Sequence, residues 1–208
     1  MKLIGQYDSP FVRRVAVALK TYGVDYEHLP WSGFGDVDKI ATVSPLRRVP
    51  VLVLDDGTPV TDSAAILETI DELVGPAHAT LNREGAERIE MLRLAAFASG
   101  AADKGVALVY ERAFREGHAM WVERCHTQIV ETLALLERER AARPDPWLFG
   151  DTPSHADVML GTMLTFLAEA LPDAFEYPPA LTAHRTACEA LPAFANAYQP
   201  FRITLPAE

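Results

Sequence analysis

The 208-residue chain is poor in cysteine and carries no excess of positive charge. Its two cysteines, Cys125 and Cys188, are too few for a disulfide framework and are expected as buried thiols in a reducing compartment. Lys and Arg number 19 against 29 Asp and Glu, which gives a formal net charge of −10. Because such a surface is repelled by phosphate backbones and anionic lipids, neither nucleic acid nor membrane is expected as a partner.

Long apolar runs are also missing. No stretch of 18 apolar residues occurs, so no transmembrane helix is expected. Residues 1–7 lack the basic start and apolar run of a signal peptide, and a cytoplasmic location is therefore expected. The composition is 49% hydrophobic and 23% charged, which is ordinary for a globular protein and sufficient for a sizeable core.

Several catalytic and metal-binding patterns are absent. The chain has no Gly-x-Ser-x-Gly segment and no phosphate-cradling glycine loop. His118 and His126 would lie about 12 Å apart along a helix, too far for one common zinc site. His184 and Cys188 are spaced to share a metal, but a structural role is preferred for them. No metal site is therefore predicted.

The first part of the chain alternates short apolar runs with helical patterns. Strands are expected over residues 2–6, 25–29, 49–54 and 58–61. Helices are expected over residues 11–22 and 63–73, with a less defined loop and helix over 31–46. This order predicts a small mixed α/β sheet with helices on its faces.

Strand patterns stop after Gly75-Pro76. Helical periodicity then continues over residues 82–115, 118–143, 154–170 and 179–190. The chain is therefore expected to have a mixed domain over 1–76, a short linker, and an all-helical domain over 82–208.

Ser9-Pro10-Phe11 stands where the first strand gives way to the first helix. A helix start presents unpaired N–H groups and a partial positive charge, which stabilise an anion such as a thiolate. Arg13 and Arg14 are expected to add positive charge nearby. The alternative is that Ser9 only caps the helix.

Two further segments have the same kind of ambiguity. Val49–Pro50 opens a strand; a cis bond there would turn the backbone of Val49 toward a peptide ligand, whereas a trans bond would be an ordinary strand-edge proline. Asp62 and Ser63 precede a helix and could hold the ammonium and carboxylate groups of an amino acid, or could simply cap it.

Taken in this order, these segments resemble the glutathione transferase superfamily. A fourth segment resembles the capping box of that family: Ser154-x-x-Asp157, whose loss through Asp157→Ala is expected to cost about 0.5–2 kcal/mol. The resemblance covers nearly the whole chain. It implies a thioredoxin-like N-terminal domain, a helical-bundle C-terminal domain and glutathione as co-substrate.

The resemblance also implies roles for individual residues. The backbone of Val49, before a cis Pro50, would pair with the cysteinyl part of glutathione, and Asp62 with Ser63 would hold the γ-glutamyl group. Ser9 would activate the thiol, with Phe11 of the same motif placed in the glutathione site.

Ser9 stands where the cysteine classes of the family have cysteine, and this argues against thiol–disulfide chemistry. Tyr7 is a rival activator, since some classes use a tyrosine near the end of the first strand. Lys39 and Arg48 are candidates for binding the glycine carboxylate.

The expected function is attack by activated glutathione on a small hydrophobic electrophile; the alternative is a non-catalytic binder of glutathione or of a hydrophobic ligand. The electrophile would contact four aromatic side chains, for which core or surface packing is the alternative: Trp31, Phe34, Tyr110 and Phe114. The resemblance further implies a homodimer.

Overall fold

The computed structural model describes residues 1–203, which form two compact units. The first unit comprises residues 1–82 together with the segment that begins at Leu191, and the second comprises Arg83–Ala190. The domain limits 1–76 and 82–208 stay a prediction; the compact units differ from them in the segment after Ala190.

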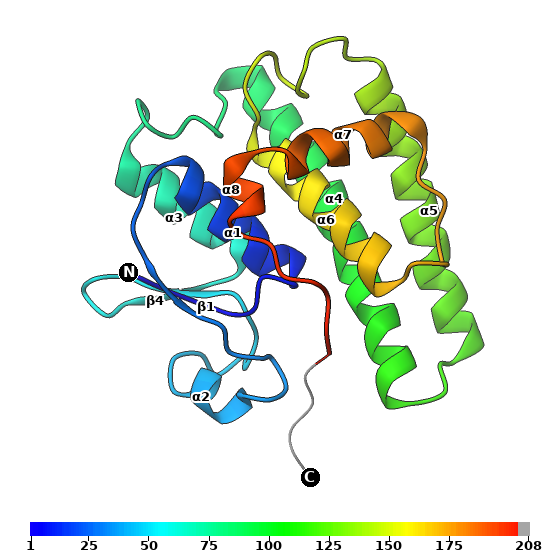
Figure 1. Ribbon diagram of the computed structural model, residues 1–208, viewed down its shortest axis with the longest axis horizontal. Coiled ribbons are helices and arrows are strands. Elements are labelled where there is room, and N and C mark those ends of the chain that lie inside the picture. The colour runs from blue at the N-terminus through cyan, green and yellow to red at the C-terminus, as the bar shows by residue number, and fades with distance from the viewer. Residues whose placement is uncertain (204–208) are drawn as a thin grey trace. The chain divides into compact units, whose positions relative to one another are not determined.

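The first unit is built on a four-stranded sheet, as the sequence predicts. Its elements in chain order are β1 (Lys2–Ile4), α1 (Pro10–Thr21), β2 (Glu27–Leu29), α2 (Val37–Ala41), β3 (Val51–Val53), β4 (Pro59–Thr61), α3 (Ser63–Val74) and α8 (Pro192–Ala195). The strands lie in the order β2-β1-β3-β4, with β1 parallel to β2 and the other pairs antiparallel. Helices α1 and α3 cover one face of the sheet and α2 the other (Figure 1).

Successive side chains along each strand point to opposite faces of the sheet, so the apolar core of this unit has two layers. Leu3 pairs with Leu52, and both are fully buried on the face covered by α1 and α3. The neighbouring pair, Ile4 with Val51, points the other way and packs with Ile40 of α2. A one-residue register slip would exchange these two sets, so the hydrophobic pattern fixes the register.

The register also brings several loops to one edge of the sheet. Ile4 at the end of β1 pairs with Leu29 at the end of β2 and with Val51 at the start of β3. Val51 in turn pairs with Thr61 at the end of β4. The segments after β1, β2 and β4 and the segment before β3 therefore meet at the same edge.

The second unit is helical, as predicted. It contains α4 (Gly85–Phe114), α5 (Ala119–Ala141), α6 (His155–Ala170) and α7 (Pro179–Glu189). Residues 155–167 of α6 are all buried, and this helix packs against both α4 and α7. The approach of α4 is close, because a Cβ at Gly105 would lie 2.5 Å from Cδ2 of Leu167.

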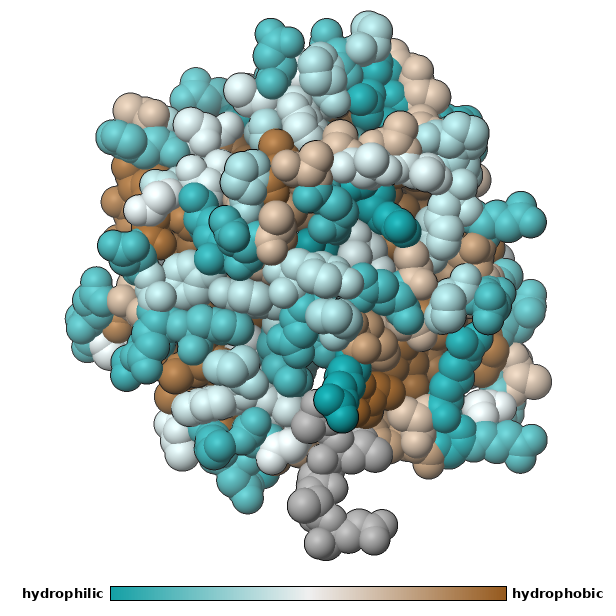
Figure 2. Space-filling model, in the orientation of Figure 1, coloured by the Kyte–Doolittle hydropathy of each residue, from teal (hydrophilic) through white to brown (hydrophobic). Residues whose placement is uncertain are grey.

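On the face shown in Figure 2, hydrophilic residues cover most of the surface and hydrophobic residues form separate groups. Within residues 1–203, no helix combines the length and the hydropathy that crossing a bilayer requires.

Arg13 has a different role from the one expected. It is 3% exposed, and its Nε and Nη2 donate to the carbonyl oxygens of Ala197 (2.9 Å) and Phe194 (3.2 Å). Its guanidinium also lies 5.3 Å from the ring centroids of Phe194 and Tyr198. Arg13 therefore holds α8 and the following residues against α1, a contact between segments far apart in sequence.

Candidate active site

Ser9 caps the N-terminus of α1 and keeps a hydroxyl proton to donate. Its Oγ accepts from the N–H of Val12 over a long 3.4 Å, and Pro10 is the first helical residue. The side chain is half-buried, and its hydroxyl donates no hydrogen bond to any residue from 1 to 203. The capping and the activating interpretations are compatible, because accepting from Val12 leaves the hydroxyl hydrogen available.

The loop before Ser9 packs tightly at Gly5. This glycine has φ +130°, and a Cβ there would lie 2.5 Å from Cγ2 of Val12 and 2.9 Å from Cβ of Val49. The end of β1, the first turn of α1 and the segment before β3 therefore touch at one point. Only glycine combines this backbone conformation with so little space.

Tyr7 lies on the same loop, and its hydroxyl forms a hydrogen bond with that of Tyr26. Its Oη lies 2.7 Å from the Oη of Tyr26, and its ring stacks on His28 at a centroid distance of 3.9 Å. Burial raises the pKa of the Tyr7 phenol, and the hydrogen bond with Tyr26 only partly opposes this rise. The phenol is therefore protonated at neutral pH.

Val49–Pro50 is a cis peptide bond, which confirms that expectation. Pro50 is buried and Val49 half-buried. Within the described residues, neither the N–H nor the C=O of Val49 takes part in a backbone hydrogen bond. Both groups can therefore pair with the backbone of a bound peptide.

Asp62 caps α3 and retains one oxygen for another partner. Its Oδ1 accepts from the N–H groups of Ala64 (2.8 Å) and Ala65 (3.3 Å), while Oδ2 has no hydrogen bond to any residue from 1 to 203. Its φ of +72° is rare for a residue with a side chain and costs about 1–3 kcal/mol, a strain typical of functional positions. The following Ser63 is 5% exposed and begins α3.

A buried positive charge stands near Asp62. Arg14 on α1 is 4% exposed, and burial lowers the pKa of its guanidinium to about 10, although the carboxylate of Asp62 opposes the change. Of the two arginines that follow the Ser9 motif, Arg14 is therefore the one whose charge interacts with a predicted site residue.

Comparison with known proteins identifies the family. The model of the glutathione S-transferase N-terminal domain matches residues 3–78, and that of the C-terminal domain matches residues 119–199. A probable glutathione S-transferase of Nicotiana tabacum is 32% identical over 160 residues, which are 76% of this chain and 67% of that protein. This chain belongs to the glutathione S-transferase family. It has the thioredoxin-like N-terminal domain and helical C-terminal domain of that family.

Solved structures of this family extend the likeness over the whole chain. A glutathione S-transferase of Methylobacterium radiotolerans in complex with glutathione sulfonate has a TM-score of 0.89 and 26% identity, covering 100% of this chain and 98% of that one. One from Methylobacillus flagellatus with glutathione bound has a TM-score of 0.83 and 25% identity, covering 99% of each chain.

A further relative is matched over a shorter length. An uncharacterized GST-like protein of Escherichia coli K12 is 37% identical over 113 residues. The match spans 54% of this chain and 55% of the length of that relative.

The basic and aromatic candidates have the following surroundings, each within its own unit. Lys39 is exposed and pairs with Asp36 at 2.6 Å, and Arg48 is exposed. Trp31 packs against the core cluster around Ile40, so its packing interpretation is supported. On α4 of the helical unit, two rings lie 6.0 Å apart and are 43% and 48% exposed: those of Tyr110 and Phe114.

The capping box of the helical domain is present and fully buried. Asp157 Oδ2 accepts from the N–H (2.8 Å) and the hydroxyl (2.6 Å) of Ser154, and Oδ1 accepts from the N–H of Leu148 (2.9 Å). His184 Nε2 and Cys188 Sγ both approach the carbonyl oxygen of Asp157, at 3.4 and 3.6 Å. This pair therefore has a structural role, and residues 1–203 contain no cluster of three or more His, Cys, Asp or Glu able to hold a metal.

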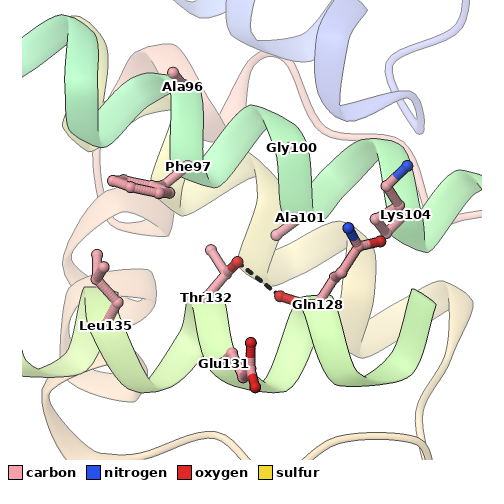
Figure 3. A pocket seen from close by; sticks show the side chains of 9 residues that line it. All are labelled: Ala96, Phe97, Gly100, Ala101, Lys104, Gln128, Glu131, Thr132 and Leu135. Carbon is pink, nitrogen blue, oxygen red and sulfur yellow. Dashed lines mark hydrogen bonds between the residues drawn. The ribbon is translucent and has the colours of Figure 1, made fainter. Parts of the chain in front are cut away.

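A separate groove of about 350 Å³ lies between α4 and α5 (Figure 3). It contains none of the predicted glutathione-binding residues. Its lining mixes small, apolar and charged side chains: Ala96, Phe97, Gly100, Ala101, Lys104, Gln128, Glu131, Thr132 and Leu135. The hydroxyl of Thr132 donates to the backbone carbonyl of Gln128, so it is satisfied within α5.

Proposed function

We propose that this chain is a glutathione transferase in which Ser9 activates the glutathione thiol for attack on a small hydrophobic electrophile. The observation that carries the proposal is the half-buried hydroxyl of Ser9 at the start of α1, which caps the helix weakly and keeps a proton to donate. Family relatives crystallised with glutathione or its sulfonate support glutathione as the co-substrate.

The energetics of thiol activation fit this arrangement. A free cysteine thiol has a pKa of about 8.5, so only a few per cent is thiolate at neutral pH. Lowering that pKa by about two units requires roughly 2.7 kcal/mol of preferential thiolate stabilisation. A hydroxyl donor contributes about 1.5–3 kcal/mol to a charged acceptor, and the positive end of α1 adds about 0.3–1 kcal/mol.

The remainder of glutathione would be held along the same sheet edge. The free N–H and C=O of Val49, next to Pro50, suit the cysteinyl backbone. Oδ2 of Asp62 suits the ammonium of the γ-glutamyl group, while the hydroxyl and the N–H of Ser63 suit its carboxylate. Phe11, half-buried on the first turn of α1, lies next to this tripeptide in the proposal.

Ser9 is preferred over Tyr7 because Ser9 lies at the N-terminus of α1, where the positive end of the helix also stabilises a thiolate. A serine also excludes a mixed disulfide with glutathione, so the proposed reaction is conjugation or a related attack by the thiolate. The alternative is a non-catalytic binder, which need not lower the thiol pKa. The proposed assembly is a homodimer, as the family resemblance implies.

The test compares Ser9→Ala, Ser9→Gly and Tyr7→Phe. Loss of the hydroxyl should raise the pKa of the bound thiol by about one to two units and reduce turnover roughly 10- to 100-fold. Ser9→Gly is the matched control for helix capping, since glycine at an N-cap costs only a few tenths of a kcal/mol. Both Ser9 variants should therefore lose activation alike, while Tyr7→Phe changes it little.

Thiol pKa is measured by ultraviolet titration of the glutathione complex, and turnover with a panel of electrophiles. If Tyr7→Phe loses activity and the Ser9 variants keep it, the two residues exchange roles. If the wild-type complex has the thiol pKa of free glutathione, the protein is a binder and the proposed reaction is wrong.

A further inference from the structure

Three side chains form a clamp beside the loop that carries Ser9: Tyr7, Tyr26 and His28. Tyr26 and His28 are two residues apart at strand β2, so they point to the same side. The hydroxyl of Tyr26 meets that of Tyr7 at 2.7 Å, and the ring of His28 lies parallel to the Tyr7 ring, with an interplanar angle of 2° and centroids 3.9 Å apart.

His28 makes a second contact with the same loop. Its Nε2 lies 2.8 Å from the carbonyl oxygen of Gly5, and Nε2 must donate because a carbonyl oxygen only accepts. The imidazole of His28 therefore contacts the loop at two points: the carbonyl of Gly5, four residues before Ser9, and the ring of Tyr7, two residues before it.

The loop is short and is fixed on its other side as well. The N–H of Ser9 donates to the carbonyl of Gln6 at 3.2 Å, closing a turn, and Gly5 donates to the carbonyl of Leu29 at 2.9 Å. Val12 and Val49 lie so close to Gly5 that a Cβ there would clash with both. His28 therefore contacts the segment from Gly5 to Tyr7, which leads directly into the turn that carries Ser9.

From this geometry we infer that His28 is a positioning residue of the thiol site, which acts by holding the loop so that the hydroxyl of Ser9 points toward the bound thiol. The inference rests on the proposed function, since it assigns His28 a part in thiol activation. His28 does not donate to the thiol itself; it fixes Gly5 and Tyr7, and through them Ser9. A displacement of a catalytic group by about 1 Å can lower the rate about 100-fold, so a smaller displacement of the Ser9 hydroxyl is sufficient for a severalfold loss.

The experiment uses His28→Ala, which removes both contacts, and His28→Phe, which keeps the stacked ring but not the donor. We expect His28→Ala to raise the thiol pKa of bound glutathione by about half to one unit and to lower kcat about 3- to 10-fold, with KM for glutathione changed less than about twofold. His28→Phe should fall between His28→Ala and the wild type.

Tyr22→Phe is the matched control. It removes a 2.7 Å hydrogen bond from a half-buried tyrosine to Asp71 in the same unit, at the end of α1 remote from Ser9. It should lower the thermal stability without moving the thiol pKa.

The outcomes separate the two proposals. If the thiol pKa is lowered in the wild-type complex and equally lowered in the His28→Ala and His28→Phe complexes, the positioning role is wrong and the proposed function stands. An equal thiol pKa shift in Tyr22→Phe also overturns the positioning role, because the effect would then follow stability. A wild-type complex with an unperturbed thiol pKa overturns the proposed function and the positioning role with it. Should His28→Ala not fold, His28→Phe decides.

Discussion

Replacing Asp157 with alanine removes both oxygens of a carboxylate that is fully buried at the start of α6. Oδ1 accepts from the N–H of Leu148, and Oδ2 accepts from the N–H and hydroxyl of Ser154. The hydroxyl can rotate to another acceptor, but the two backbone N–H groups cannot. The variant therefore leaves two buried donors without their acceptor.

The magnitude follows from these contacts. Each stranded buried donor costs about 1–3 kcal/mol, so the two together cost about 2–6 kcal/mol. We expect Asp157→Ala to lower the free energy of unfolding by about 4 kcal/mol, more than the 0.5–2 kcal/mol expected for a helix cap from the sequence. For a chain of this length that corresponds to a Tm lower by about 10 °C.

Thermal and urea unfolding of three variants measure the effect. Ser154→Ala should cost about 1 kcal/mol, as for an ordinary cap. Asp151→Ala, at an exposed position just before the capping box, should stay within about 0.5 kcal/mol of the wild type. An Asp157→Ala protein whose Tm matches that of Asp151→Ala would show that the buried carboxylate contributes no stability, and the reasoning would be wrong.

Two further predictions concern pH and assembly. Burial lowers the pKa of His184 below its usual value of about 6.5, although the carboxylate of Asp157 opposes the change. The unfolded chain therefore binds more protons than the folded one just below pH 6.5, so the free energy of unfolding should fall as pH decreases through that range. The His184→Gln variant should lose this part of the pH dependence, as measured by urea titrations at several pH values. A profile identical to that of the wild type would contradict the prediction. The chain should also scatter light as a dimer at micromolar concentration, with a mass twice that of one chain; the mass of a single chain would refute the homodimer.

The kind and order of the longer elements could be predicted because their signals are local. Helical periodicity and the caps of α1 and α6 are contained within a few residues of sequence. The helix α8 was not predicted, because four residues are too few to show a period. Its charge and its distance along the chain predict Arg13 near Ser9, whereas its partners Phe194 and Ala197 lie at the other end of the chain.

The candidate site was predictable to a similar extent. Ser9 and the Asp62 cap each have a local signal, whereas the cis bond before Pro50 is expected only from the family resemblance. The stacking of His28 on Tyr7 was missed, because it depends on β2 lying beside β1. The sequence indicates this contact only through the spacing of Tyr26 and His28, which places both side chains on one face of the strand.

The long cap at Ser9 connects activation with the start of the helix. An N-cap side chain normally contributes about 1 kcal/mol by accepting a backbone N–H, but at 3.4 Å this bond is weak. The hydroxyl is therefore held loosely by α1, and its direction depends on the backbone that carries it. That backbone is fixed by the tight packing of Gly5 and by the contacts of the clamp. Thermal stability and thiol activation should consequently respond to different substitutions. Ser9→Gly should change the Tm little and raise the thiol pKa of bound glutathione strongly, whereas Tyr22→Phe should lower the Tm and leave that pKa unchanged.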